Sequence, residues 1–245
     1  MNNKKDYLNE LKKRVIAVGI IFISILVIGL IFSEAILKFV ISSVNPENVS
    51  IVLLSPYESI SLFFQVILWF AIIVTLPFVI YHAIRFIGPS LDKKERRIFL
   101  IIPFAATILF FIGALFGYFS TKEIMMPFII SLGNDLGIVN MWSISSVLMF
   151  YIYICLFLGI SFEMPLLAVA LVKIKVLHPS FLSHYRKHSY IAMLVIDAIV
   201  TPTTDAFSMI VIAIPLIVLY EITIIVSKMA SRKEDINSYM LKEVK

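Results

Sequence analysis

The chain has 245 residues, of which 60% are hydrophobic and 15% charged, and its mean hydropathy is +1.00. A soluble domain of this size needs far more polar residues to cover its surface, so the composition excludes a soluble globular protein. The net charge of +5 comes from cations confined to a few loops, which indicates membrane topology and not nucleic-acid binding. The single cysteine, Cys155, lies inside an apolar run, so no disulfide framework and no CxxC site is expected.

The first element follows a basic N-terminal segment. Residues 15–33 are free of charge, and this run of nineteen residues is longer than the apolar core of a secretory signal peptide. No small-x-small cleavage site follows it, so we expect a first transmembrane helix. Further runs of spanning length follow in chain order. We predict one membrane domain over residues 1–245, with spans at about 15–37, 60–84, 98–121, 146–172, 189–203 and 207–227 and a cytoplasmic tail at 228–245.

The fifth run differs from the others because it is short. Residues 189–204 would rise only about 24 Å as a helix, which is less than the roughly 30 Å hydrocarbon core. The sequence T-P-T-T-D at 201–205 predicts a tight outer hairpin to the sixth run, since proline ends the preceding helix. No internal repeat is visible, which counts against the inverted-repeat transporter folds.

The distribution of lysine and arginine predicts which side each loop occupies. Segments 1–14, 85–97, 173–188 and 228–245 carry 5, 5, 4 and 5 of these residues, whereas the three intervening loops carry 1, 1 and 0. A split of 19 to 2 predicts that both termini lie in the cytoplasm.

Motifs of enzymes and of cofactor sites are missing from the sequence. It contains no GxxxxGK[ST] loop, no GxGxxG and no zinc signature. His178, His184 and His188 lie in one cationic loop without a carboxylate or cysteine as a further ligand, which favours a solvated loop over a metal site. With no nucleophile beside a base, we predict no enzyme, no cofactor and no metal.

Three acids fall inside predicted spans: Glu163, Asp197 and Glu221. A charge at mid-membrane costs about 2.5–3.5 kcal/mol, so each should face protein or water and not lipid. Such an acid either contacts a partner or a translocating chain, or it is neutral or hydrogen-bonded and holds the bundle together. A GxxxG pattern, Gly113 to Gly117, predicts a close helix-packing face in the third span.

Two further acids, Glu10 and Glu95, lie on the predicted cytoplasmic side at the junctions of helices with the membrane. Glu95 is flanked on both sides by two cations, in the sequence K-K-E-R-R. On spacing alone, each is best interpreted as a loop charge neutralised by its neighbours.

Several motifs, in order along residues 7–227, give this chain a resemblance to a known family. They are L-x-E-L-K-K-R (8–14), S-P-Y-E (55–58), P-F-V-I-Y-H-A-I-R-F-I-G-P-S-L (77–91), K-K-E-R-R (93–97), F-x-x-G-x-x-F-G-Y-F (110–119), G-I-S-F-E-M-P (159–165), T-P-T-T-D-A-F-S (201–208) and A-I-P-L-I-V-L-Y-E (213–221). Together they resemble the TatC family, the multi-span subunit of the twin-arginine, Sec-independent protein translocase.

The resemblance implies an all-α integral membrane protein: a concave bundle of six transmembrane helices with short fifth and sixth helices and both termini in the cytoplasm. It implies a receptor and core translocase component that binds paired-arginine signal peptides and helps export folded proteins using the proton-motive force. The expected partners are these signal peptides, small single-span subunits of the TatA or TatB type, further copies of the chain and membrane lipids, but no nucleic acid. The expected location is the plasma membrane of a prokaryote, since no Ser/Arg-rich transit segment precedes the first span.

Site residues are also implied by the resemblance. Two guanidinium groups favour two carboxylates, and signal-peptide binding is expected at Glu10, Glu95, Phe86, Pro89 and Arg14. An intramembrane polar or partner-contacting set is expected at Glu163, Pro202, Asp205, Ser208 and Glu221.

The chain departs from the family pattern at Lys12, Met209 and Asp197. Lys12 keeps the charge of the usual arginine without its planar fork, Met209 stands where a glutamine is common, and the resemblance supplies no role for Asp197. A proton-coupled small-solute transporter is the alternative, because three acids lie inside the predicted spans.

Overall fold

The computed structural model describes the backbone of residues 2–44, 49–87, 96–137, 139–173, 176–201 and 205–243. Side chains are described for residues 9–44, 49–82, 104–137, 139–173, 176–201 and 205–231. Over these residues the chain is almost entirely helical, apart from one pair of three-residue strands.

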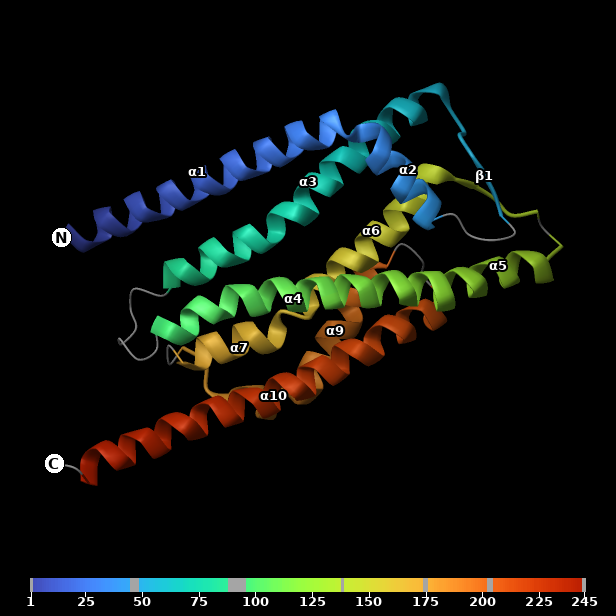
Figure 1. Cartoon of the computed structure of the whole chain (residues 1–245). Coiled ribbons are helices and arrows are strands. Elements are labelled where there is room, and N and C mark those ends of the chain that lie inside the picture. Colours follow the sequence, from blue (N-terminus) through green and yellow to red (C-terminus); the bar gives the residue numbers. More distant parts are fainter. Residues whose placement is uncertain are drawn as a thin grey trace.

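The elements in chain order are α1 (Asn2–Ile31), α2 (Ser33–Val44), β1 (Ser50–Val52), α3 (Pro56–Ile87), α4 (Arg96–Ser120), the π-helical turn η2 (Thr121–Met125), α5 (Met126–Asp135), β2 (Met141–Ser143), α6 (Ile144–Ser161), α7 (Met164–Lys173), α8 (Pro179–His184), α9 (Arg186–Val200) and α10 (Ala206–Glu243). The long helices run roughly side by side in an elongated bundle (Figure 1). The predicted multi-span helical membrane fold is confirmed.

Among the described residues, five segments are long and apolar enough to cross a membrane: Asn9–Ile31, Pro56–His82, Phe104–Asp135, Ile144–Lys173 and Ala206–Ser231. The predicted fifth span corresponds to α9, which has only 15 residues, so the count of six spans stays a prediction. The sixth helix differs from the short one that the resemblance implies. Helix α10 has 38 residues and continues to Glu243, since no glycine or proline interrupts the sequence after Pro215.

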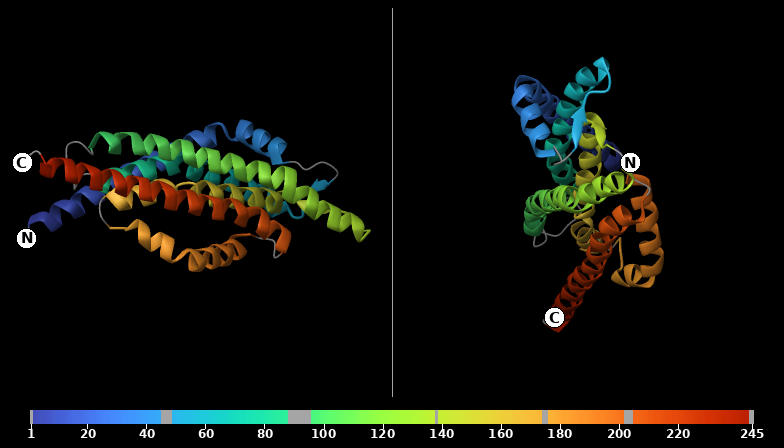
Figure 2. Two further views of the ribbon diagram at one scale, coloured as in Figure 1. Left: turned by 90° about the horizontal axis from the view of Figure 1, so that it is seen from below. Right: turned by 90° about the vertical axis from the view of Figure 1, so that its right-hand side faces the viewer.

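The N-terminal end of α1 and the C-terminal end of α10 lie at the same end of the bundle (Figure 1). We call this the inner end, because the lysine and arginine count predicts that it faces the cytoplasm. At the opposite, outer end lie β1, β2 and α5 (Figures 1 and 2).

Helix α4 packs closely on α6 in the middle of the bundle. A Cβ atom built on Gly113 would lie 2.7 Å from the carbonyl oxygen of Leu158, and one on Gly117 would lie 3.0 Å from the Cα atom of Cys155. Only glycine allows the two backbones to approach this closely. The predicted packing role of the GxxxG face is confirmed.

The predicted fourth span consists of two helices and not one. Helix α6 ends at Ser161 and α7 begins at Met164, with Phe162 and Glu163 in the turn between them. Pro165 lies in the first turn of α7 and has no backbone N–H, so a continuous helix would lose a hydrogen bond there. The break places Glu163 at a bend inside the bundle.

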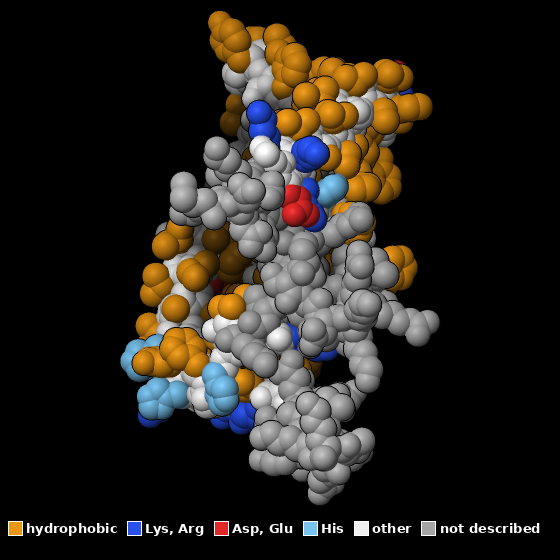
Figure 3. Space-filling view, turned by 90° about the vertical axis from the view of Figure 1, so that its left-hand side faces the viewer, with side chains coloured by type: hydrophobic (Ala, Val, Ile, Leu, Met, Phe, Trp, Pro, Cys, Tyr) orange, Lys and Arg blue, Asp and Glu red, His pale blue; other side chains and the backbone are white. Residues whose placement is uncertain are grey.

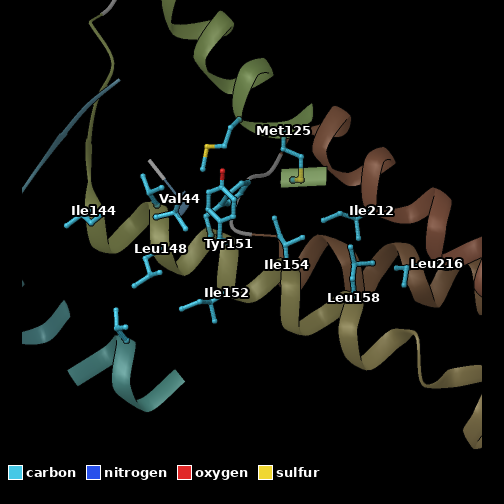
Figure 4. Close-up of a cluster of buried hydrophobic side chains, with 14 of the residues drawn as sticks. Val44, Met125, Ile144, Leu148, Tyr151, Ile152, Ile154, Leu158, Ile212 and Leu216 are labelled. Carbon is cyan, nitrogen blue, oxygen red and sulfur yellow. The ribbon is translucent and has the colours of Figure 1, made fainter. Parts of the chain in front are cut away.

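Buried apolar side chains from distant parts of the chain meet around α6 (Figure 4). Ile154 and Leu158 of α6 pack with Met125 of η2 and with Ile212 and Leu216 of α10, and each of these side chains is almost completely buried. Elsewhere α1 packs on α3, and α7 packs on α10. Helix α6 therefore forms the centre of the bundle.

The outer end is held by contacts between segments far apart in the sequence. Strands β1 and β2 pair in parallel, with Ile51 opposite Trp142. The Tyr118 hydroxyl of α4 donates a hydrogen bond of 2.8 Å to the carbonyl oxygen of Ser43 at the end of α2. These contacts close the outer end over the core.

Candidate functional site

The first candidate residue, Glu10, lies in α1 near the inner end. Its side chain is 38% exposed, and its Oε1 atom pairs with the Arg14 guanidinium one helical turn later. Arg14 also donates from Nη1 to the carbonyl oxygen of His82 on α3, over 3.0 Å. Arg14 therefore links α1 to α3 and holds the Glu10 carboxylate beside the inner end of α3.

The remaining predicted signal-peptide residues belong, in the sequence, to the end of α3 and to the segment between α3 and α4. Glu95 and Pro89 lie outside the described residues, in the segment 88–95. Phe86 belongs to the last turn of α3, and its side chain also lies outside the described part. Acidic, basic and histidine side chains gather on the inner end of the molecule (Figure 3). Glu10 and Arg14 are thus the members of this group for which the structure gives side-chain contacts.

Glu163 is buried at the bend between α6 and α7. The residue is 3% exposed, and neither of its carboxylate oxygens has a hydrogen-bond partner among the described residues. Burying an unpartnered acid costs free energy, so bundle stability alone does not account for it. Glu163 therefore faces the protein interior and not lipid, as the sequence predicts.

A second unpartnered acid lies on the short helix α9. Asp197 is fully buried, and both of its oxygens lack a partner in the described part of the chain. Ser208, in the first turn of α10, is also fully buried with an unpartnered hydroxyl. Both residues belong to the outer half of the α9–α10 hairpin, where Pro202 lies outside the described residues.

Asp205 precedes α10 and accepts a hydrogen bond of 2.7 Å from the backbone N–H of Ser208. An aspartate that accepts from the third helical residue is an N-cap, and it satisfies a backbone donor at the start of the helix. The structure thus gives Asp205 a role in starting α10, and its contact with a partner stays a prediction.

Glu221 of α10 is engaged by α9. The Tyr190 hydroxyl donates to Oε1 of Glu221, and the Arg186 guanidinium lies 3.0 Å from Oε2. A second link runs alongside, because the Ser189 hydroxyl donates to that of Tyr220 over 2.8 Å. Glu221 therefore joins α9 to α10 within the chain, unlike Glu163 and Asp197.

Glu58 is the last residue of the motif S-P-Y-E at residues 55–58, and the sequence alone predicts no role for it. Glu58 is 8% exposed and accepts from the backbone N–H of Leu54 over 2.5 Å, from the Ser143 hydroxyl and from the backbone N–H of Ser145 over 3.4 Å. Ser143 is in turn the N-cap of α6. The signal was present, since Ser-x-x-Glu with proline after the serine is a capping-box pattern at a helix start. Glu58 holds together the outer ends of α3 and α6.

Comparisons with known proteins identify the family to which this chain belongs. The family model described as TatC, Sec-independent protein translocase protein, matches residues 6–215. The chain belongs to the TatC family. Similar TatC proteins include that of Aquifex aeolicus strain VF5, with 34% identity over 94% of this chain and 96% of the relative. The TatC of Helicobacter pylori strain 26695 has 31% identity over 93% of this chain and 88% of the relative.

A solved TatC structure has the same fold. The crystal structure of a twin arginine translocase receptor, TatC, matches with a TM-score of 0.80 and 31% identity, covering 92% of this chain and 99% of that chain. This TatC-family chain is therefore a transport protein and not an enzyme: a component of the Sec-independent protein translocase, which implies a complex with other subunits. The small-solute transporter is not supported.

Proposed function

We propose that this TatC-family chain is the receptor for paired-arginine signal peptides and binds them at its inner end. The observation that carries the proposal is the carboxylate of Glu10, which is 38% exposed at that end and is held there by its pair with Arg14. Glu95 directly precedes Arg96, the first residue of α4, in the sequence. Two carboxylates offer bidentate acceptors for two guanidinium groups.

Around this site, the chain is the core of a complex that exports folded proteins across the plasma membrane of a prokaryote, driven by the proton-motive force. Small single-span subunits of the TatA or TatB type dock on the α9–α10 hairpin, and several copies of the chain assemble together. The support comes from α9, which exposes Ile191, Val195 and Ile199 along one side. A helix of 15 residues is shorter than the hydrocarbon core of a bilayer is thick. Packing of a longer partner helix against α9 would compensate for this difference in length.

The receptor role is tested by photo-crosslinking a paired-arginine signal peptide to the protein in membrane vesicles. Crosslinking to Glu10→Ala/Glu95→Ala should fall at least tenfold, since about 1.4 kcal/mol of lost binding free energy is a factor of ten. The matched control is Glu34→Ala, which removes an equivalent i,i+4 carboxylate from its pair with Lys38. Undiminished crosslinking in the double variant would reject the assignment of these two acids.

Docking on the hairpin is tested by cysteine crosslinking between position 199 and a single-span subunit. The Ile199→Cys variant should form the crosslink, and Ile16→Cys on the exposed face of α1 is the comparison site. Equal crosslinking at both positions would contradict specific docking on α9.

A further inference from the structure

An open pocket lies between α8 and α10, away from the Glu10 site. Its volume is about 580 Å³, and the residues that form it include His178, Ser180, Ser183 and His184 around α8 and Lys228 and Ser231 of α10. Histidine and basic side chains are grouped beside exposed hydrophobic ones on one side of the inner end (Figure 3). None of the described residues that line this pocket is expected to bind a signal peptide or to contact a partner.

Two serine hydroxyls of the pocket are already engaged within the chain: that of Ser183 donates to the carbonyl oxygen of Pro179 over 3.3 Å, and that of Ser180 lies 2.6 Å from Nδ1 of His178. The Nδ1 atom of His178 is engaged by Ser180, whose backbone N–H lies 3.3 Å from it, so Nε2 is the ring nitrogen left for a ligand. Lys228 contributes an ammonium group, for which the described residues provide no ion pair. The described residues that line the pocket include no carboxylate. This chemistry favours an anion with several acceptor oxygens.

The position of the pocket along α10 indicates where the anion comes from. Lys228 and Ser231 occupy the last turn of the apolar segment Ala206–Ser231, so the pocket lies where that segment ends. Hydrophobic side chains close in sequence to its lining residues are exposed, namely those of Phe181, Ile225 and Met229. A basic group at the end of a span, beside exposed apolar side chains, is placed to meet a lipid headgroup and its acyl chains.

We infer that the α8–α10 pocket binds the phosphate group of an anionic phospholipid from the inner leaflet. The Lys228 ammonium, the imidazole groups and the Ser231 hydroxyl contact the phosphate oxygens, and the acyl chains lie along the exposed apolar side chains. A free phosphate ion shares the headgroup chemistry but would gain nothing from the apolar surface.

The test is native mass spectrometry of the full-length protein in detergent, titrated with phosphatidylglycerol or with phosphatidylcholine. We expect retention of phosphatidylglycerol by the wild type and roughly fivefold weaker retention by Lys228→Gln, because one cation near a lipid surface contributes about 1 kcal/mol. His184→Gln should add to this loss. Lys187→Gln, which removes a nearby cation that does not line the pocket, should retain the lipid as the wild type does.

Three outcomes would overturn the inference. Equal retention of the two lipids would show that the pocket does not select an anion. An equal loss in Lys187→Gln would show only a diffuse effect of surface charge. Displacement of phosphatidylglycerol by inorganic phosphate at similar concentration would show a phosphate site and not a lipid site. Thermal unfolding of each variant, expected to match the wild type, separates loss of binding from loss of fold.

Discussion

The two ends of the bundle each present a carboxylate near the start of a helix, and they use it differently. At the outer end, Glu58 is buried and accepts from Leu54, Ser143 and Ser145. At the inner end, Glu10 is 38% exposed and has Arg14 as its partner. The carboxylate of Glu58 is buried and accepts hydrogen bonds within the fold, whereas the carboxylate of Glu10 is partly exposed and can accept hydrogen bonds from a partner. An acid therefore indicates a binding site only after its own partners within the chain are known.

The same distinction applies to the acids inside the membrane. Glu221 forms an ion pair with Arg186 and accepts a hydrogen bond from the Tyr190 hydroxyl. Glu163 and Asp197 are more deeply buried and have no partner in the described part of the structure. We expect the unpartnered acids to matter for translocation and the partnered one for holding α9 against α10.

The close packing of α4 on α6 in the middle of the bundle holds both ends in place. The largest expected loss of stability is therefore at this contact. Gly113→Val should destabilise the protein by about 1–3 kcal/mol, because the added atoms meet the backbone of α6. Thermal unfolding in detergent measures this loss. Gly19→Ala is the control, since nothing lies within 4 Å of a Cβ atom at that glycine. An equal effect of the two changes would contradict close packing of α4 on α6.

The next largest effect is expected at the outer end. Glu58→Ala should lower the unfolding temperature by roughly 4–8 °C, because it leaves the donors at the starts of α3 and α6 without their acceptor. Hydrogen exchange should become faster at residues 50–58 and 141–146 and remain unchanged near Glu10. If Glu58→Ala instead reduced signal-peptide binding without a loss of stability, the two ends would not differ as described.

A smaller change of opposite sign is expected inside the membrane. Asp197→Leu should raise the unfolding temperature by roughly 2–4 °C, since it removes a buried carboxyl group without a partner. Export of a paired-arginine substrate should fall in the same variant if Asp197 serves the assembled complex. A destabilised Asp197→Leu would mean that this acid has a stabilising partner and belongs with Glu58.

The smallest effect is expected for an exposed ion pair at the surface. Glu34 and Lys38 lie 2.6 Å apart, and their side chains are 82% and 77% exposed. Glu34→Ala should change stability by less than about 0.5 kcal/mol and leave signal-peptide binding intact. A larger loss of stability, measured by thermal unfolding, would show that the partners of an exposed acid do not predict how much it contributes to stability.

The sequence predicts the elements that depend on local pattern. The apolar runs predict the long helices, Gly113 and Gly117 predict the close packing of α4 on α6, and the loop cations predict one side for both termini. Contacts between distant segments could not be predicted from the sequence, because no local pattern specifies the parallel pairing of Ser50 with Met141.

The sequence predicts which residues belong to the site but not which contacts they make with one another. The motif around Glu10 indicates its importance, but its link to α3 through Arg14 depends on the packing of two helices. The break at Glu163 could have been inferred from Pro165, and the cap made by Asp205 from its place before a helix. The partners of Glu58 on β2 and α6 could not, since they follow it by more than 80 residues.

The central claim, that inner-end carboxylates receive the arginines of a signal peptide, is tested most directly by a double-mutant cycle. The affinity of a signal peptide with both arginines, or with both changed to glutamine, is measured for the wild type and for Glu10→Gln/Glu95→Gln. If the acids contact the arginines, the two changes are coupled, and each costs at least tenfold less once the other is present. Strictly additive losses would contradict the account.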